Sequence, residues 1–463
     1  MNVKRHFAVA FASFDFFLRQ LIAVRRTTHW AWLVLGYALF LWASLMWTGV
    51  HLDAPDNLTA ACVYLASGLT LKMHRRTTDR SNPVVLGIVL GLGYLSKTVM
   101  FPVALVFLAV TVVTIVARPA TARQLLAGPL AFALVAAPFI AALSISKGRL
   151  TFGDSGRLNY FWYINGHADK HWQGEPPGSG IPAHPTRQIF ERPAVFEFAT
   201  PVGGTSPTWY DPSYWHEGVA LHVDARQELR AVSKNLYQYL KLFLGALMLG
   251  YGILIYASGE VRGSLERLRA NWWIWLPAVA GLTVYMLAMD MSGGFVSSRL
   301  AAPFIVLLCA GVFSSVEVSS RRSTRALIAL TAVALVVMGQ GLFGDAYQNV
   351  RVVKTGAAPI DWQVAADLRR VGVKSGDSIA VIGDADRNAF WARLARVRIV
   401  AQVWRADDFW GADAATRDRA LQAIRKTGAK VVVWETKTGL SAEVVPQTGW
   451  RKLEHSNGYV YFL

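Results

Sequence analysis

The sequence contains very little cysteine and relatively little charge. Only Cys62 and Cys309 occur in 463 residues, and both lie in apolar stretches. This scarcity excludes a disulfide framework and a cysteine-based zinc site. Charged residues make up 17% of the chain, with 30 acidic side chains against 47 Lys and Arg. A composition this poor in charge is not that of an ordinary soluble enzyme.

Apolar and aromatic residues take the place of the missing charges. The chain is 53% hydrophobic, contains 17 Trp and 15 Tyr, and has a mean hydropathy of +0.32. These values predict a membrane protein. The formal net charge of +17 is carried largely by basic residues beside apolar stretches, where orientation in the bilayer explains them. We therefore expect membrane lipids, and no nucleic acid, as partners.

Long apolar stretches predict about nine transmembrane segments, judged against roughly 20 apolar residues per crossing. The third and fourth are short and meet near Lys97, so two half-helices or a tight re-entrant hairpin is an alternative there. The predicted fold is a polytopic α-helical membrane protein with segments 1–5 within 30–146 and segments 6–9 within 237–345. The nine stretches are 30–50, 56–73, 83–97, 99–117, 124–146, 237–257, 271–290, 298–318 and 324–343.

The loops differ in charge between the two sides of this arrangement. Four connections on one side are rich in Lys and Arg: HRRTTDR (74–80), RPATAR (118–123), EVRGSLERLR (260–269) and SSRRSTR (319–325). Positively charged loops stay in the cytoplasm. The opposite, extracytoplasmic side then receives 51–57, 147–236, 290–299 and everything from about 346 onward.

Residues 1–29 predict a separate cytoplasmic or interfacial segment. Phe7, Phe11, Phe14, Leu18 and Leu21 recur at helical spacing, as in a helix that lies in the membrane interface. A signal peptide fits poorly, because an Asp interrupts the apolar core and no small-residue cleavage site follows. The N-terminus is therefore predicted to be cytoplasmic.

The C-terminal region, 346–463, predicts a soluble α/β domain on the extracytoplasmic side. Helical stretches such as IDWQVAADLRRVG alternate with apolar strands such as DSIAVIG, VRIVAQV and KVVVWE, which indicates a mainly parallel sheet. The segment VIGDADRNAF resembles a strand that leads into a phosphate-binding loop. It lacks the spaced glycines of a dinucleotide fingerprint, so a structural or recognition module is favoured.

The long loop at 147–236 combines many aromatic side chains with carboxylates, His and Arg. Aromatic rings flanked by polar groups suit carbohydrate, because the apolar face of a sugar stacks on a ring while its hydroxyls are hydrogen-bonded. An interfacial aromatic belt is the alternative. Its five His residues show no compact metal-binding pair, so no metal ligand is assigned and a divalent cation remains open. The candidate sugar or acceptor contacts are Asp154, His171, Glu175, Tyr210, Asp211, Trp215 and Glu217.

Three segments resemble a known family. They are HLDAPDNLTAACVYLASGL (51–69), GLGYLSKTVMFPVAL (91–105) and SSRLAAPFIVLL (297–308). Together with the multi-span organisation they look like the C-type membrane glycosyltransferases, in particular the bacterial family 39 and aminoarabinose-transferase-like enzymes. The resemblance implies a sugar donor linked to polyprenyl phosphate, used on the periplasmic face of the bacterial inner membrane. The chain departs from the family by lacking an N-terminal span followed by a first outward loop with a catalytic Asp.

The residue types at these positions fit sugar transfer from a lipid phosphate. Such a reaction needs a carboxylate that accepts the proton of the attacking hydroxyl and cations that neutralise the departing phosphate. Asp56 or Asp53 supplies the carboxylate, and capping of the next helix is the alternative role. Lys97 binds phosphate or extends to the interface. Further phosphate-binding candidates are Arg299, Arg157 and Arg187.

Two function classes follow from this. The first is a membrane glycosyltransferase that moves a sugar from a polyprenyl phosphate carrier to an envelope glycan or lipid. The second is a catalytically inactive relative that binds envelope glycan or lipid. A transporter is disfavoured, because it would place charged or broken helices near the bilayer midplane and most of the apolar stretches here are clean.

Overall fold

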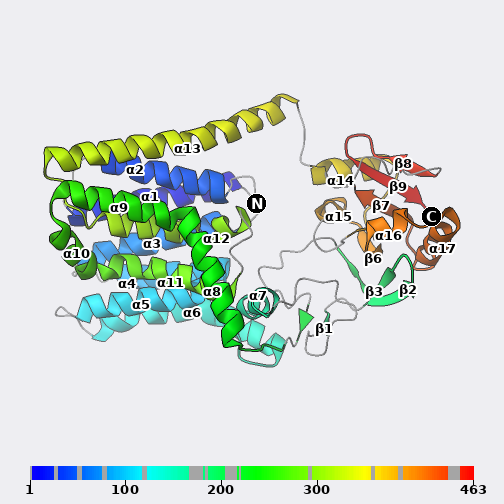
Figure 1. The fold of residues 1–463 in the computed structure, drawn as a ribbon. Coiled ribbons are helices and arrows are strands. Elements are labelled where there is room, and N and C mark those ends of the chain that lie inside the picture. Colours follow the sequence, from blue (N-terminus) through cyan, green and yellow to red (C-terminus); the bar gives the residue numbers. More distant parts are fainter. Residues whose placement is uncertain are drawn as a thin grey trace. The chain divides into compact units, whose positions relative to one another are not determined.

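The computed structural model divides the chain into two compact units (Figure 1). Unit 1 comprises residues 1–167 and 221–348, and unit 2 comprises 168–220 and 349–463. The structure describes residues 3–25, 30–48, 55–75, 81–116, 122–165, 181–182, 186–203, 216–217, 220–289, 295–355, 360–383, 389–435 and 449–463.

Unit 1 is a bundle of apolar helices. Its first half contains α1 (Val3–Arg25), α2 (Trp30–Trp42), the π-helical turn η1 (Ala43–Thr48), α3 (Asp56–Arg75), α4 (Asn82–Ser96), α5 (Met100–Val116), α6 (Ala122–Lys147) and α7 (Ser155–Tyr163). Its second half contains α8 (Ala225–Tyr239), the π-helical turn η3 (Leu240–Leu244), α9 (Gly245–Ser258), α10 (Val261–Ala270), α11 (Trp272–Ala288), α12 (Phe295–Phe313) and α13 (Arg321–Thr355).

Within the described residues, five helices are long and apolar enough to cross a membrane, judged by length and composition alone. They are Arg5–Val24, Trp30–Thr48, Leu126–Lys147, Ala225–Ser258 and Arg321–Gly344. Four further apolar helices are shorter: Asn82–Ser96, Met100–Thr114, Trp272–Ala288 and Ser298–Phe313. The nine expected segments therefore correspond to four of the long helices, the four short ones and α3.

The separate interfacial segment expected within residues 1–29 is corrected for the described residues 3–25, which form α1 and pack into the bundle, whereas the cytoplasmic placement stays a prediction. Phe14 and Phe17 of α1 are at most 1% exposed, and their rings lie 5.2 and 6.4 Å from the ring of Tyr64 in α3. The polar side chain of Asp15 is tolerated in α1 because Tyr37 of α2 donates a 2.5 Å hydrogen bond to its carboxylate. Helix α1 is thus a packed member of the bundle.

The contacts of α1 also fix the direction of the first three helices. The Phe7 ring lies against Phe40, and the Leu18 side chain lies against Gly36. Helices α1 and α2 are therefore antiparallel. Phe14 lies against Tyr64, and Arg75 donates to Gln20, so α1 and α3 are parallel. The start of α1 and Asp56 therefore lie at the same end of the bundle. A cytoplasmic start of α1 and an extracytoplasmic Asp56 are incompatible with this packing.

Helices α4 and α6 approach closely because glycine lies at their contact. A Cβ atom at Gly87 would lie 2.2 Å from the carbonyl oxygen of Gly128, a separation that no larger residue permits. Small residues that let backbones approach are typical of helix packing in membranes. This packing holds α4 in place directly before the turn that carries Lys97.

Unit 2 is built on one seven-stranded mixed sheet with the strand order β2-β3-β6-β5-β7-β9-β8. The strands are β2 (Thr186–Phe190), β3 (Val195–Val202), β5 (Ser378–Ile382), β6 (Arg398–Val403), β7 (Val431–Glu435), β8 (Trp450–Lys452) and β9 (Gly458–Phe462). A separate pair joins β1 (Ile181–Pro182) to β4 (His216–Glu217). The helices are α14 (Ile360–Arg370), α15 (Phe390–Ala395), α16 (Ala406–Trp410) and α17 (Ala414–Arg425).

The expectation of a mainly parallel sheet is corrected. Only β5 pairs in parallel, with β6 on one side and β7 on the other, whereas all other pairings are antiparallel. Residues 379–382 of β5 are buried, which fits a central strand, because helices cover both faces of a parallel core. Strands β2 and β3 come from the segment predicted as a separate loop at 147–236, so the chain divides differently from the predicted domains at 147–236 and 346–463.

Polar contacts hold the edges of unit 2. Asp367 of α14 is 1% exposed and accepts hydrogen bonds from the backbone N–H of His455 at 2.8 Å and from Arg370 at 2.7 Å. At the start of the parallel strands, the Asp377 carboxylate accepts from Lys430 Nζ at 2.5 Å and from the Lys374 backbone N–H at 2.8 Å.

The Asp377 contacts predict a pH dependence of unit 2. Partial burial opposes ionisation of Asp377, but hydrogen bonds from Lys430 and the Lys374 backbone outweigh it and lower the pKa of the carboxyl. Its stabilisation is present above the unfolded-state pKa of about 3.9 and is lost as pH falls through the lower folded-state pKa. Because Lys430 is 64% exposed, we expect about 1 kcal/mol or less. The hydrogen-exchange protection factors of 378–382, corrected for the intrinsic exchange rate at each pH, should fall below about pH 4, and this fall should be smaller in Asp377→Asn.

Candidate functional site

A buried carboxylate begins α3 at one end of the bundle. Asp56 is the first residue of α3 and is 5% exposed. The preceding Pro55 carbonyl accepts from the Thr59 backbone N–H at 2.9 Å and from its hydroxyl at 3.2 Å, which closes the first helical turn. The positive end of the helix dipole favours a carboxylate at this position.

The turn between α4 and α5 presents a lysine to this carboxylate. Lys97 leaves the helix with φ −160° and ψ 130°, while its N–H donates to Gly93 and its carbonyl accepts from Met100, both at 3.0 Å. Its side chain is 13% exposed, and its ammonium group forms an ion pair and hydrogen bond with Asp56 Oδ1. A tight turn thus joins α4 to α5, and whether the two helices form a re-entrant hairpin or two full crossings stays a prediction.

A second cation reaches the same carboxylate from α12. Arg299 Nε lies 3.1 Å from Asp56 Oδ2, and the Arg299 side chain is 21% exposed. The geometry is that of an ion pair without a hydrogen bond, and neither Arg299 Nε nor Asp56 Oδ2 has a hydrogen-bond partner among the described residues. One carboxylate with two cations leaves a formal charge of +1, so this buried cluster can accept a further anion.

Hydroxyl groups surround the cluster. Ser96 and Thr59 share a hydrogen bond of 3.1 Å between their hydroxyl oxygens, and Ser96 also donates to the Gly93 carbonyl at 2.6 Å. Tyr285 of α11 is 4% exposed and lies within electrostatic reach of Asp56 and Arg299. Sequence reasoning missed these three residues; only Ser96 was signalled, by its place before Lys97 in GLGYLSK.

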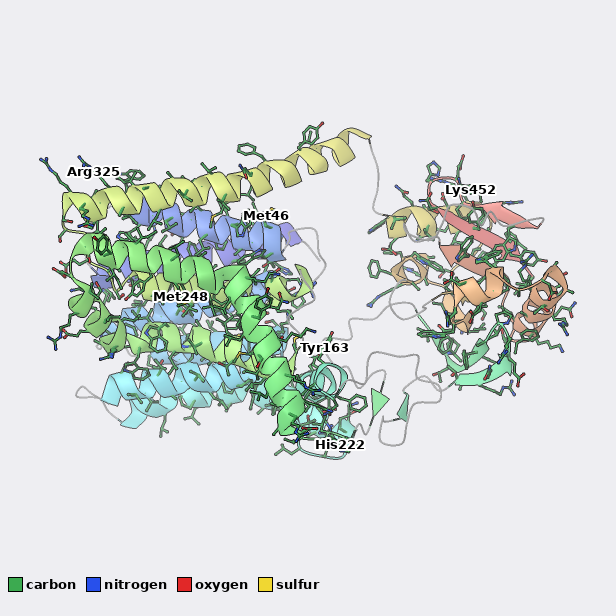
Figure 2. All side chains as sticks on the ribbon, viewed as in Figure 1. Met46, Tyr163, His222, Met248, Arg325 and Lys452 are labelled. Carbon is green, nitrogen blue, oxygen red and sulfur yellow. The ribbon has the colours of Figure 1, made fainter. Side chains whose placement is uncertain are left out.

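The segment after α6 folds over the Lys97 turn. Tyr94 donates a 2.9 Å hydrogen bond to the Phe152 carbonyl, and the Phe101 and Phe152 rings stack with centroids 4.4 Å apart. Gly153 has φ +128°, and a Cβ there would lie 2.7 Å from Thr98 Cγ2. The beginning of the long loop thus packs against the Lys97 turn. Figure 2 shows Tyr163 and His222 near one end of the bundle and Arg325 at the other.

The other predicted residues are distributed differently. Asp154 is 5% exposed and pairs with Arg149 at 2.5 Å, so its described contact stabilises the chain before α7. Arg157 lies on α7 and is partly buried. Arg187 lies on β2 in unit 2 and pairs with Glu197 at 2.6 Å.

Several of the predicted sugar or acceptor contacts, and the alternative base Asp53, are residues whose side chains the structure does not describe. Glu217 pairs through its backbone with Ile181 in the short β1–β4 ladder. Asp53, His171, Glu175, Tyr210, Asp211 and Trp215 lie outside the described residues. Within the described part, no group of three or more His, Cys, Asp or Glu is arranged to hold a metal, and the divalent cation stays an untested prediction.

Comparisons with known proteins give one distant structural similarity. No family model and no curated protein matches the sequence. The crystal structure of the Archaeoglobus fulgidus oligosaccharyltransferase in its apo form matches 93% of this chain and 57% of that chain, at 13% identity and a TM-score of 0.39. The chain thus spans a little over half the length of that protein. At this level of similarity no residue role is transferred, and the site is argued from its own geometry.

Proposed function

We propose that the chain is a membrane glycosyltransferase that transfers a sugar from a polyprenyl phosphate-linked donor to an envelope glycan or lipid on the extracytoplasmic face. The observation that carries this proposal is the convergence of Asp56, Lys97 and Arg299, because one carboxylate and two cations are what the transfer needs. The resemblance of GLGYLSK to the C-type glycosyltransferases supports it.

The reaction assigns a separate role to each charge. The acceptor oxygen attacks the anomeric carbon, the bond from that carbon to the donor phosphate oxygen breaks, and the bonding electrons leave with the polyprenyl phosphate. Asp56 takes the proton of the acceptor hydroxyl. Lys97 and Arg299 neutralise the leaving phosphate. In the resting cluster both cations contact Asp56, so binding of the donor phosphate draws them away and frees the carboxylate.

The proposal is tested by the release of the lipid carrier, which does not require that the acceptor be known. The purified chain in nanodiscs is offered a panel of decaprenyl phosphate-linked hexoses and pentoses, together with an envelope extract as acceptor source. Extract-dependent formation of free decaprenyl phosphate supports a transferase. Saturable quenching of tryptophan fluorescence by a donor without any carrier release favours the non-enzymatic alternative, a protein that binds envelope glycan or lipid.

The side of the membrane on which the site lies can be predicted from the basic loops. Tyr163, 46% exposed, lies at the Asp56 end, and Val261, 50% exposed, lies among the basic residues of the opposite end. Both native cysteines are buried, so background labelling is low. In intact cells an impermeant maleimide should label Tyr163→Cys and not Val261→Cys. The reverse pattern would contradict an extracytoplasmic site.

A further inference from the structure

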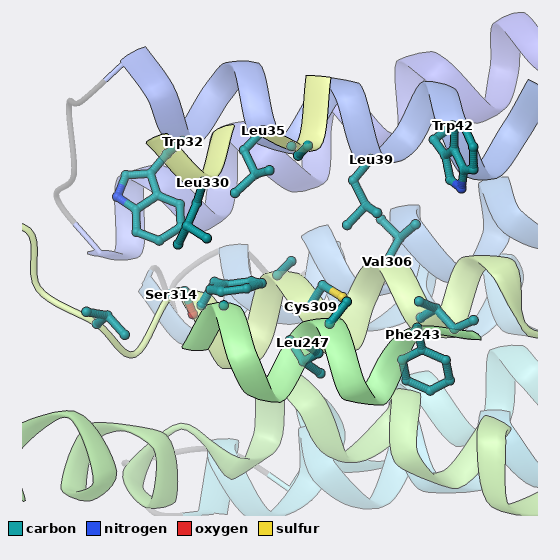
Figure 3. A pocket seen from close by; sticks show the side chains of 18 of the residues that line it. Trp32, Leu35, Leu39, Trp42, Phe243, Leu247, Val306, Cys309, Ser314 and Leu330 are labelled. Atoms are coloured by element: carbon teal, nitrogen blue, oxygen red, sulfur yellow. The ribbon is translucent and has the colours of Figure 1, made fainter. Parts of the chain in front are cut away.

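A second site lies along the bundle, and α12 is the helix that it shares with the cluster of Asp56, Lys97 and Arg299. A cavity of about 1250 Å³ is lined by residues of α1, α2, η3, α9, α12 and α13. None of the three charged residues of the candidate site lines it. Figure 3 shows its wall running from Trp32, Ser314 and Leu330 to Trp42 and Phe243. Its lining is overwhelmingly apolar.

The cavity is deep along the helix axis. On η3 and α9 its lining extends from Lys241 to Ile253, a rise of roughly 18 Å at about 1.5 Å per residue. The hydrocarbon core of a bilayer is about 30 Å thick, so the cavity is deeper than one leaflet. An extended lipid chain fits this shape, whereas a compact polar ligand would leave the aromatic walls without contacts.

The two basic residues in the lining differ in their contacts. Arg267, near the basic end, is fully engaged: it donates to the Ser315 carbonyl at 2.8 Å and pairs with Glu260 at 3.0 Å and Glu317 at 3.3 Å. Lys241 has no ion-pair partner among the described residues, and its ammonium lies 5.5 Å from the Tyr237 ring. The cavity therefore carries one available cation, within the π-helical turn η3, a type of distortion often found at functional sites.

Helix α8 extends this positive charge beyond the cavity. At about 100° per residue, Arg230, Lys234 and Lys241 lie within roughly 40° of one another on the α8–η3 surface. Tyr237, which is 58% exposed, lies on the same side of the helix, next to Lys241. Basic side chains beside an exposed aromatic ring are typical of a surface that contacts anionic lipid headgroups.

We propose that this cavity binds an anionic lipid, with its chain between α2, α9 and α12 and its phosphate at Lys241. The cavity supplies the apolar walls and Lys241 the complementary charge, and Arg230 and Lys234 raise the local concentration of anionic headgroups. This inference goes beyond the proposed function, because the site involves no sugar chemistry. A variant inactive in carrier release can still bind the lipid, so the two proposals fail separately.

The test uses a photoreactive lipid with the full chain in phosphatidylcholine nanodiscs. A phosphatidylglycerol with a diazirine in its acyl chain should crosslink to α9 and α12 peptides that line the cavity. Lys241→Glu should reduce this labelling at least fivefold, and Arg262→Glu, a matched charge reversal at the opposite end with a 96% exposed side chain, should not. If the Glu variant does not fold, Lys241→Gln should give a reduction of the same sign.

A second pair of variants tests the cavity itself. Ala246→Trp places a bulky ring in the lining and should abolish labelling, whereas Met248→Trp, on the same helix but 65% exposed and outside the lining, should not. Equal labelling by the diazirine analogue of phosphatidylcholine would reveal ordinary annular lipid and overturn the proposal. Loss of labelling in excess inorganic phosphate would reveal a free-phosphate site and overturn it as well.

Discussion

Asp56→Asn is expected to reduce release of decaprenyl phosphate by about 10³-fold, within the range lost when a general base is removed. Asn has nearly the size of Asp, and it caps helices equally well, so the start of α3 should be preserved. What is lost is the ability to accept a proton. The measurement is the rate of carrier release at saturating donor, compared with donor binding by tryptophan fluorescence.

The matched control for this substitution is Asp224→Asn. Asp224 also stands at a helix start, where its carboxylate accepts from the Arg226 N–H at 2.8 Å and the Gln227 N–H at 3.4 Å. It is exposed and has no ion-pair partner among the described residues, so its Asn variant should retain full activity. An Asp56→Asn protein that also retained full activity would show that Asp56 is not the base.

Lys97→Met is expected to lower carrier release by about 10²- to 10³-fold, the loss typical of removing one preorganised electrostatic contact to a developing charge. Met keeps the length and apolar stem of Lys but cannot pair with phosphate or with Asp56. Stability should fall too, by about 3 kcal/mol, because a buried carboxylate loses one of its two cations. Lys97→Arg, which keeps the charge, should retain more activity than Lys97→Met.

The double variant Asp56→Asn, Lys97→Met separates a structural role from a chemical one. Removal of both members of a buried ion pair is far less destabilising than removal of one, so thermal stability should recover towards the native value. Carrier release should remain lost, since base and cation are both absent. Recovery of activity together with stability would indicate that the pair only holds α3 against the Lys97 turn.

The candidate site could be predicted residue by residue but not as a cluster. Each of the three charged residues, Asp56, Lys97 and Arg299, lies at the start or the end of a different apolar stretch. Their side-chain types predicted roles in proton transfer and phosphate binding. That Asp56 contacts both cations depends on the packing of α3, α4 and α12. Tyr285, in the middle of an apolar run, gave no signal, because a buried Tyr beside the site looks the same in sequence as one that faces lipid.

Residues 1–29 and 186–202 illustrate where local patterns mislead. The spacing of Phe7, Phe14 and Leu21 indicates an amphipathic helix, and a helix of that kind either lies on a membrane or packs in a bundle. The rings of Phe14 and Phe17 against Tyr64 decide for the bundle. In the same way, the strand character of 195–202 was hidden by Pro- and Gly-rich surroundings, and pairing with β6 reveals it.

The sequence by itself determined the apolar helices, the basic loops and the alternation of helices and strands after 359, because hydrophobic periodicity and charge act over short stretches of chain. Only the tertiary structure decided that Asp56 and Lys97, 41 positions apart, share one ion pair and that β2 and β3 complete a sheet begun far along the chain. Contacts of this kind depend on which helix faces and strand edges meet. Close packing at particular residues, such as that of Gly87 against α6, determines which faces can meet.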